Sequence, residues 1–321
     1  MNRPVWAAVT LCCLLAGAGC QRSRKKVVAV IPKANSHLFW VAVEAGVRAA
    51  GREFAVEVLW NGPATETEYT RQIQILEAMV ARRVDGIAIA AAERKALVQP
   101  VERAVKLGIP VTIFDSGLDT EQYMSYIATD NVEAGRMGAR ALGGLVGGKG
   151  NVAIVLHATG SQSTMDREQG FEEVIGKEFP DIRIVARQYG MSSRAKSLEA
   201  AENILTAHPD LAGIFASTEP SAAGISLALK SRNLAGKVKF VGFDSSDAMI
   251  EDLKNGVMQA TVIQNPFLMG FEAVKSIVDK LNGVEPPRRR DLPARVITAA
   301  DLDDPEVRKV LSPDVKQYLD P

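Results

Sequence analysis

The sequence predicts an α/β fold with two successive units, each built on a parallel sheet that helices cover on both faces. Short runs rich in Val and Ile alternate with longer stretches of helical periodicity, which is typical of buried parallel strands and the helices between them. This alternation starts again after Gly150. A length of 321 residues suits about two domains, and a hydrophobic content of 47% is ample for a core in each.

Eight apolar runs are the expected strands, four in each unit. Between two of them, Ile73, Leu76 and Val80 recur at the spacing of a helix with one apolar face. Ligands of such sheets bind beyond the carboxyl ends of the strands, so the residues after each strand are candidates for a site. The expected strands are VVAVI (27–31), VEVLW (56–60), GIAIA (86–90), PVTIF (110–114), NVAIVL (151–156), IRIVARQ (182–188), LAGIFA (211–216) and VKFVGF (238–243).

The start of the chain has the pattern of a secretory signal. Arg3 gives a positive beginning, an apolar run covers 5–15, and small residues follow at 16–19. The apolar run is too short to span a bilayer permanently. The alternative is a buried N-terminal helix, which the small residues and the basic stretch QRSRKK after them do not favour. We therefore expect an exported protein with a signal peptide over residues 1–19.

The three cysteines of the chain, Cys12, Cys13 and Cys20, all lie in or just after this segment. The stretch AGAGC resembles the lipobox of bacterial lipoproteins, in which the signal is cut before a cysteine that then carries a lipid. This resemblance implies a lipid anchor on Cys20, followed by a linker over 20–26. The alternative is ordinary signal cleavage nearby, with a free cysteine. In either case the mature body contains no disulfide.

The residues after the strands combine carboxylates, an arginine, polar groups and aromatics. A sugar presents hydroxyls at its rim and C–H groups on its faces. Carboxylates accept hydrogen bonds from hydroxyls, arginine donates a fork of them, and aromatic rings cover the C–H faces. The candidate ligand-binding residues are Lys33, His37, Phe39, Trp40, Asp115, Arg167, Thr218, Asp244 and Gln264.

Each of these residues also has a structural interpretation. Asp115 and Asp244 could cap helices or turns. Phe39 and Trp40 are adjacent, so on a helix their side chains point about 100° apart and one of them belongs to the core. His37 could be a helix N-terminal residue without a ligand. The combination at strand ends, rather than any single residue, indicates a binding site.

Six strings are distinctive when they occur together: GIPVTIFDS, SYIATDNVEAG, DREQGF, LTAHPDLAGIFAS, VKFVGFDSS and GVMQATVIQNP. Because of these strings, the chain resembles the ribose-binding-like periplasmic sugar-binding proteins, which are the type I solute-binding proteins of ABC importers. The resemblance covers about residues 27–298. The resemblance implies two Rossmann-like lobes with parallel sheets, joined by a hinge of three crossings, and a sugar held in the cleft between them. It also implies the roles of the nine candidate residues as ligand contacts.

The resemblance further implies where the lobes begin and end. The hinge matches Thr129–Asp130, Gln264–Asn265 and a third crossing near 290–294. Residues 299–321 extend past the family core and are expected to form a terminal helix packed on one lobe, with a disordered tail as the alternative. The lobes are an N-terminal lobe of 27–129 and 265–291 and a C-terminal lobe of 130–264 and 292–298.

The chain departs from the ribose-type pattern at several site positions. Ser116 stands where ribose receptors usually have Arg, and His37 and Thr218 stand where they have Asn. Lys33 instead resembles receptors for the furanosyl-borate autoinducer. The resemblance therefore implies a sugar or sugar-like ligand, and ribose itself is not the expected one.

Other function classes are excluded or less favoured. Lys+Arg and Asp+Glu are equal at 38, so there is no basic excess for nucleic acid. The stretch GGLVGGKG (143–150) is not a phosphate-binding loop, because Gly150 rather than Ser or Thr follows Lys149. The three His lack the spacing of metal ligands. We expect no enzyme activity, cofactor or metal.

Two related roles stay open. A repressor-like effector domain shares this fold but needs a helix-turn-helix before it, where this chain has a signal-like segment. A sensory receptor for a chemotaxis or kinase partner uses the same closed form. The expected protein is a periplasmic, lipid-anchored monomer that binds a sugar and serves an ABC permease.

Overall fold

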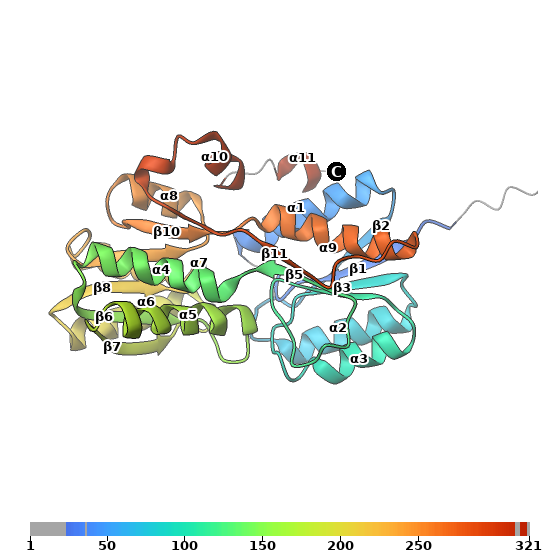
Figure 1. Ribbon diagram of the computed structural model, residues 1–321, viewed down its shortest axis with the longest axis horizontal. Helices are drawn as coiled ribbons and strands as arrows, with labels where there is room; N and C mark the ends of the chain where they lie inside the picture. The colour runs from blue at the N-terminus through green and yellow to red at the C-terminus, as the bar shows by residue number, and fades with distance from the viewer. Residues whose placement is uncertain (1–23, 36, 312–314, 320–321) are drawn as a thin grey trace, which may run out of the picture.

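The computed structural model describes residues 24–35, 37–311 and 315–319. Within them the chain forms two lobes that lie side by side along the long axis of the molecule (Figure 1), each with a six-stranded sheet. The predicted signal peptide and the predicted lipidation site, Cys20, lie outside the described residues. No helix in the described part of the chain is both long and apolar enough to cross a membrane.

The sheet of the first lobe is entirely parallel and has the order β11-β5-β4-β3-β1-β2. Its strands are β1 (Val27–Ile31), β2 (Glu57–Trp60), β3 (Gly86–Ile89), β4 (Val111–Phe114), β5 (Ser125–Thr129) and β11 (Arg289–Leu292). Its helices are α1 (Leu38–Glu53), α2 (Tyr69–Ala81), α3 (Val98–Lys106) and α9 (Pro266–Leu281).

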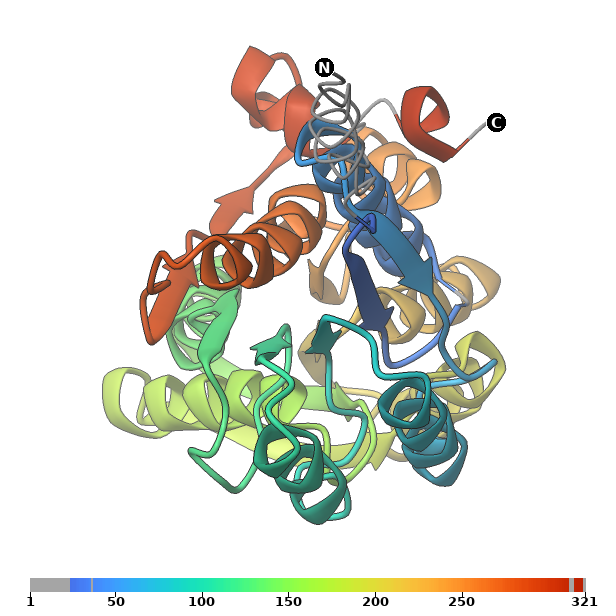
Figure 2. The same cartoon turned by 90° about the vertical axis from the view of Figure 1, so that its right-hand side faces the viewer.

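Helices cover both faces of this sheet (Figure 2), and the alternation of side chains along each strand explains why. In β1, Val28 and Val30 pack in one core with α1 and α9, whereas Ala29 and Ile31 pack in another with α2 and α3. Both faces are therefore apolar, which is why the strands read as continuous hydrophobic runs.

The second lobe repeats this plan with the order β12-β10-β9-β8-β6-β7, in which only β12 runs antiparallel to its neighbour among the described strands. Its strands are β6 (Lys149–Leu156), β7 (Asp181–Tyr189), β8 (Leu211–Ala216), β9 (Lys239–Phe243), β10 (Ala260–Ile263) and β12 (Arg295–Ile297). Its helices are α4 (Asn131–Leu145), α5 (Gln162–Glu178), α6 (Arg194–Ala207), α7 (Glu219–Ser231) and α8 (Asp247–Lys254).

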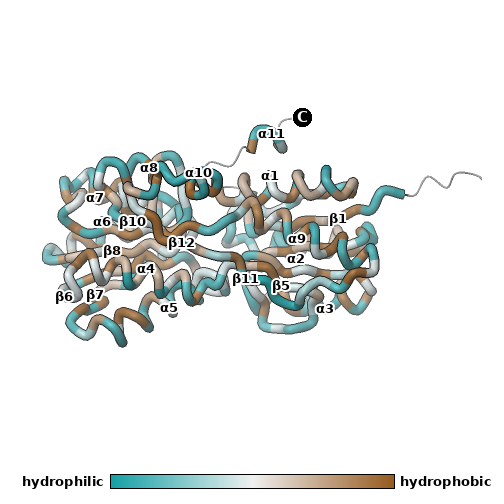
Figure 3. The backbone as a smooth tube through the Cα atoms, turned by 45° about the horizontal axis from the view of Figure 1, so that its top comes forward, coloured by the Kyte–Doolittle hydropathy of each residue, from teal (hydrophilic) through white to brown (hydrophobic). Residues whose placement is uncertain are grey.

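The predicted α/β fold with two parallel-sheet lobes is confirmed. All eight predicted strands are present, and each ends within two residues of the predicted position. Figure 3 shows these hydrophobic segments running through the middle of each lobe. The eight expected strands do not include β5, β10, β11 and β12. The clearest case is β11, whose sequence RRDL is mostly exposed and carries no apolar run.

The chain passes between the lobes at 129–131, 263–266 and 292–295, where successive elements belong to different sheets or lobes. Two of these passages lead directly into a capped helix. The side chain of Asp130 accepts a hydrogen bond from a backbone N–H at the start of α4, and that of Asn265 does the same for α9. Both caps satisfy otherwise unpaired helix donors and set the direction of each helix where the chain changes lobe.

Past the second lobe, the extension forms a 3-10 turn, η1 (Ala299–Asp301), and two short helices, α10 (Pro305–Leu311) and α11 (Lys316–Leu319). We expected a helix on one lobe. Instead α10 packs on the second lobe, whereas α11 lies against α1 of the first (Figure 1).

Candidate functional site

A cavity between the lobes is lined by side chains from both of them. The free volume inside it is about 30 Å³, so the side chains of the two lobes nearly fill the space between them. All nine residues singled out from the sequence line it: Lys33, His37, Phe39, Trp40, Asp115, Arg167, Thr218, Asp244 and Gln264. The cavity wall is completed by residues that sequence reasoning did not select: Glu66, His157, Ser163, Thr164, Ser192, Glu219 and Pro220.

The two aspartates of the site have strained backbones. Asp115 directly follows β4 and has a φ of 59°, and Asp244 directly follows β9 and has a φ of 68°. His37 and Ser192, which also line the cavity, have φ values of 77° and 52°. A left-handed conformation costs a residue with a side chain roughly 1–3 kcal/mol, and such residues cluster at functional sites. Four of the eight non-glycine residues with positive φ in the described part of the chain line this cavity, which is consistent with a binding role for them.

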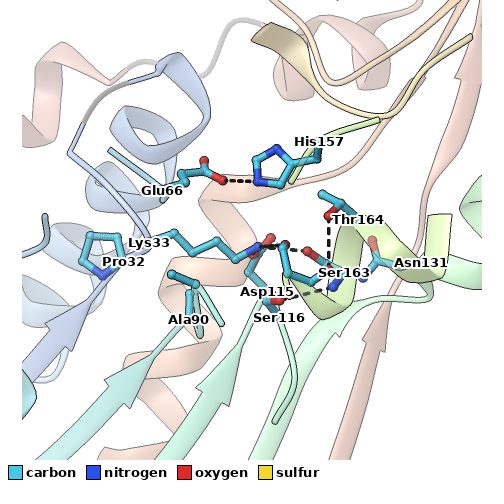
Figure 4. Close-up of polar contacts among 12 residues, drawn as sticks. Pro32, Lys33, Glu66, Ala90, Asp115, Ser116, Asn131, His157, Ser163 and Thr164 are labelled. Carbon is cyan, nitrogen blue, oxygen red and sulfur yellow. Dashed lines mark hydrogen bonds and ion pairs between the residues drawn. The ribbon is translucent and has the colours of Figure 1, made fainter. Parts of the chain in front are cut away.

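Lys33 joins the two lobes inside the cavity (Figure 4). Its Nζ lies 2.8 Å from Asp115 Oδ2 in the same lobe. It also donates hydrogen bonds to Ser161 Oγ (3.1 Å) and Ser163 Oγ (2.9 Å), at the beginning of α5 in the other lobe. All four side chains are buried. The ammonium is therefore fully engaged, and it fixes the position of the Asp115 carboxylate.

A buried glutamine holds the loop that carries Lys33. Gln72 Nε2 donates to Pro32 O (2.8 Å) and Ala90 O (2.7 Å), and its Oε1 accepts from the Ala92 N–H (3.0 Å). One side chain on α2 thus ties together the segments that follow β1 and β3. This bonding gives Lys33 a rigid backbone support.

Asp244 is the centre of a hydrogen-bonded group at the hinge. Its Oδ1 accepts from Gln264 Nε2 (2.7 Å), and its Oδ2 accepts from the Glu219 N–H (3.3 Å). Gln264 Oε1 in turn accepts from Thr129 Oγ1 (2.7 Å). Burial raises the pKa of Asp244 above its usual value, although the nearby Arg167 and these donors partly oppose the shift.

The guanidinium of Arg167 is held in one orientation by neighbouring groups of the second lobe. Its Nε donates to Asn131 Oδ1 (2.8 Å), its Nη1 donates to Ser217 O (3.1 Å), and its guanidinium carbon lies 3.9 Å from the ring centre of Phe243. The aromatic face and the two acceptors hold the guanidinium in one orientation. A planar group held in this way can present its remaining N–H donors to a ligand.

Phe39 and Trp40 both reach the cavity. Their rings meet edge to face with centroids 4.9 Å apart. Trp40 is also a core residue with 2% exposure, so the expectation that one of the pair is core is correct, but that residue lines the cavity as well. Its indole N–H donates to Glu66 Oε1 (2.7 Å). The aromatic wall is thereby fixed by a carboxylate.

Glu66 and His157 form a contact across the cleft (Figure 4). Glu66, in the loop after β2, has its Oε2 3.1 Å from Nε2 of His157, which directly follows β6 in the second lobe. Burial would raise the pKa of Glu66. The hydrogen bond and charge of His157, with the charges of Lys33 and His37, outweigh burial and hold this pKa well below its usual value.

The strand-end argument could have found His157, because it is the first residue after a predicted strand. Glu66 carries no such signal, since it lies six positions beyond the end of β2 in a polar loop.

Thr218 and His37, the two predicted site residues not yet described, make local or weaker contacts. Thr218 Oγ1 donates to Ser221 Oγ (3.1 Å) beside the start of α7, and His37 Nε2 lies 3.3 Å from Ser192 Oγ of the other lobe.

No group of three or more His, Cys, Asp or Glu side chains in the described residues is arranged to hold a metal ion. The site instead offers carboxylates, a guanidinium, hydroxyls and aromatic faces. Such groups recognise a polyhydroxylated ligand by hydrogen bonds and by contact with its C–H faces.

Comparison with known proteins agrees with this geometry. A family model described as a periplasmic binding protein domain matches residues 28–285. The D-allose-binding periplasmic protein of Escherichia coli K12 is 31% identical over 259 residues, which cover 78% of this chain and 83% of that protein.

Two solved structures are similar over the whole fold. A carbohydrate transporter solute-binding protein from Agrobacterium radiobacter, in complex with D-arabinose, is 32% identical with a TM-score of 0.87 and covers 90% of this chain and 100% of its own. A solute-binding protein of an ABC transporter from Agrobacterium vitis, with bound D-fucose, is 34% identical with a TM-score of 0.87 and covers 89% of this chain and 100% of its own. The chain therefore belongs to the periplasmic binding protein family, and it is a periplasmic binding protein rather than an enzyme.

Proposed function

We propose that the protein captures a neutral monosaccharide, or a ligand closely like one, between its lobes and delivers it to an ABC import permease. The observation that carries this proposal is the cavity between the lobes, in which Asp115, Arg167 and Asp244 meet the aromatic pair Phe39 and Trp40. The relatives named above carry allose, arabinose and fucose in their names or complexes, which supports the same ligand class here.

The charges around the cavity favour a neutral ligand. Each of its four carboxylates has a basic side chain beside it, so little positive charge in the wall is left for a sugar acid or a sugar phosphate to pair with. A charged ligand would be desolvated without a compensating partner, which is costly. The pairs are Asp115 with Lys33, Glu66 with His157, Glu219 with Arg194 and Asp244 with Arg167.

Binding acts by shifting the population of open and closed forms. Contacts across the cleft include the Arg94 N–H with Gly160 O (2.9 Å) and the Ser163 N–H with Ser116 Oγ (3.2 Å). A sugar that contacts both lobes adds to these contacts only when the lobes are together, so it favours the closed form. The permease would then recognise the paired lobes, and the protein would act as a monomer.

We extend the proposal to the start of the chain. Residues 1–19 direct export, and Cys20 carries the lipid that holds the protein at the membrane. Support comes from the signal pattern and the AGAGC string alone. Residues 20–26 are then a tether between the membrane and β1.

A thermal-shift screen of the purified protein tests the ligand class. The panel holds D-allose, D-arabinose and D-fucose, with a hexuronic acid and a hexose phosphate as charged comparators. A ligand at 100 times its dissociation constant stabilises the native state by about 2.7 kcal/mol, which is readily detected. Stabilisation by neutral sugars alone is the expected result. Stabilisation by only the charged comparators, or by none of the compounds, would overturn the proposal.

A further inference from the structure

Glu219 is a buried carboxylate of the cavity that the predicted site does not include. It is the first residue of α7, lines the cavity and is 1% exposed. Its Oε1 accepts a hydrogen bond from Arg194 Nη2 at 2.7 Å. Its Oε2 is buried and has no hydrogen-bond partner among the described residues.

A buried carboxylate oxygen without a donor carries a desolvation cost that a bound hydroxyl can remove. Burial also raises the pKa of Glu219, and the neighbouring charge of Asp244 contributes in the same direction. Arg194 holds the other oxygen, and its half-exposed side chain reaches in from the beginning of α6. The carboxylate therefore has one oxygen anchored and one oxygen available beside the ligand.

We infer that Glu219 determines specificity by accepting a hydrogen bond on Oε2 from one particular hydroxyl of the sugar, with Arg194 as a positioning residue. This inference rests on the proposed function. A hydrogen bond to a charged group in a buried site is strong enough that its loss weakens affinity about ten- to a hundredfold. A sugar that lacks this hydroxyl, or presents it on the other face of the ring, should bind more weakly by the same factor.

Calorimetry with the best-binding panel sugar and its monodeoxy analogues tests the inference. Glu219→Gln should weaken binding of the parent sugar about tenfold or more. One deoxy analogue should bind wild type and variant equally, because it lacks the hydroxyl that Glu219 contacts. Arg194→Met should give the same pattern with a smaller factor, and Glu199→Gln, on the exposed surface of α6, should match wild type for every sugar.

Equal weakening of all analogues by Glu219→Gln, or no change for the parent, would overturn the role of Glu219 while leaving sugar binding intact. Absence of binding by the wild type would overturn the proposed function and this inference with it. Circular dichroism and a melting curve establish that each variant folds. If Glu219→Gln does not fold, Arg194→Met alone decides between a hydroxyl-specific and a uniform effect.

The C-terminal extension makes a link between the lobes outside the three passages of the hinge. On the second lobe, Val307 of α10 is 1% exposed and belongs to the core that includes α6 and α7. On the first lobe, the ring of Tyr318 in α11 lies 5.4 Å from that of Phe267. Arg52 of α1 donates to the carbonyls of Gln317 (2.7 Å) and Tyr318 (3.1 Å).

The chain between these two anchors is short. Leu311 and Lys316 are five positions apart, so the ends of α10 and α11 cannot separate by more than about 17 Å. Apolar side chains of the extension also line a groove against the first turn of α1 and the segment before α8. The groove residues are Leu38, Phe39, Val41, Ala42, Asp244, Ser245, Ser246, Asp247, Gln264, Pro266, Val310, Leu311 and Val315.

We propose that the extension is a strap that limits opening of the cleft. A motion that carries α1 away from the second lobe has to release α11 or extend the short join to α10. While α11 stays docked, widely open forms are less populated, and a ligand then closes the lobes at a smaller cost. Figure 1 shows α10 and α11 lying over different lobes on the same side of the molecule.

Small-angle X-ray scattering of the full chain without added sugar tests the strap. Tyr318→Ala, which removes the ring against Phe267, should increase the radius of gyration, and a chain that ends at Leu311 should increase it by at least as much. Tyr318→Phe keeps the ring and should behave as wild type. An unchanged radius of gyration in both Tyr318→Ala and the shortened chain would overturn the proposal.

Discussion

Asp115 and Asp244 occupy equivalent positions in the two lobes. Each directly follows the fourth strand of its lobe in chain order, and each has a left-handed backbone. The Asp115 N–H donates to Ile127 O of the neighbouring β5 at 3.0 Å, and the Asp244 N–H donates to Val262 O of the neighbouring β10 at 2.8 Å. The repeated fold thus places one carboxylate from each lobe at the cavity, so a ligand that bonds to both joins the lobes.

Arg167→Ala should weaken sugar binding more than tenfold, because it removes the donors that Asn131 and Ser217 hold in place and leaves these acceptors unmatched. Titration calorimetry with the best panel sugar measures the change. Arg136→Ala is the matched control, since Arg136 pairs with Glu173 at the surface. Equal affinity of wild type and Arg167→Ala would remove Arg167 from the site.

Gly135→Ala should destabilise the second lobe by about 1–3 kcal/mol or more. A Cβ on Gly135 would lie 2.0 Å from the backbone oxygen of Arg167, so α4 and α5 would have to separate. Gly144→Ala in the same helix meets nothing within 4 Å and should be neutral or stabilising by up to about 1 kcal/mol. Urea denaturation compares the two, and equal midpoints would contradict the close packing of α4 on α5.

Glu66→Gln should lower stability at pH 7 and have a smaller effect in acid. The folded protein holds the pKa of Glu66 below its ordinary value of 4.5. A carboxyl whose pKa is lowered by folding stabilises the folded state at pH values above its ordinary pKa. This contribution is lost as the pH falls towards the folded-state pKa. The difference in unfolding free energy between wild type and Glu66→Gln should be fully present at about pH 5, above the ordinary pKa.

Below about pH 4.5 the same difference should shrink. Urea denaturation at pH 7, 5, 4 and 3 provides the values. A difference that grows as the pH falls would mean that Glu66 is not stabilised as an anion by His157 and its neighbours.

Cys20→Ser should convert a membrane-associated protein into a soluble periplasmic one, because the acyl chains would have no attachment site. Fractionation of cells with an antibody against the protein measures the distribution. Globomycin, which blocks the signal peptidase of lipoproteins, should leave the precursor unprocessed in wild type. A soluble mature protein with Cys20 intact would remove the lipid anchor from the account.

The predictable parts of the fold are those in which burial is visible from the local run of residues alone. Strands such as VVAVI and LAGIFA are covered on both faces, so every position is apolar and the run is visible in the sequence. The carboxylates at the strand ends were visible for a related reason. The topology of parallel sheets brings the carboxyl ends of strands together, and Asp115 and Asp244 immediately follow theirs.

What was missed depends on contacts between distant segments. Glu66 reaches His157 only because the lobes come together, and no spacing within the chain encodes that approach. The edge strand β11 is mostly exposed, so its residues carry no hydrophobic pattern. It pairs with β5 because the chain runs along that edge of the sheet before it crosses to the second lobe. The docking of Tyr318 on Phe267 is likewise a meeting of residues 51 positions apart.

The most direct test is titration calorimetry of the best panel sugar against wild type, Asp115→Asn and Asp244→Asn. Each substitution removes the charge of one lobe's carboxylate and keeps its size. We predict that wild type binds one sugar per chain and that each variant loses at least tenfold in affinity, because charge-assisted hydrogen bonds from both lobes hold the ligand. Sugar binding that is equally tight in wild type and in both variants would contradict a ligand held between the lobes at this cavity.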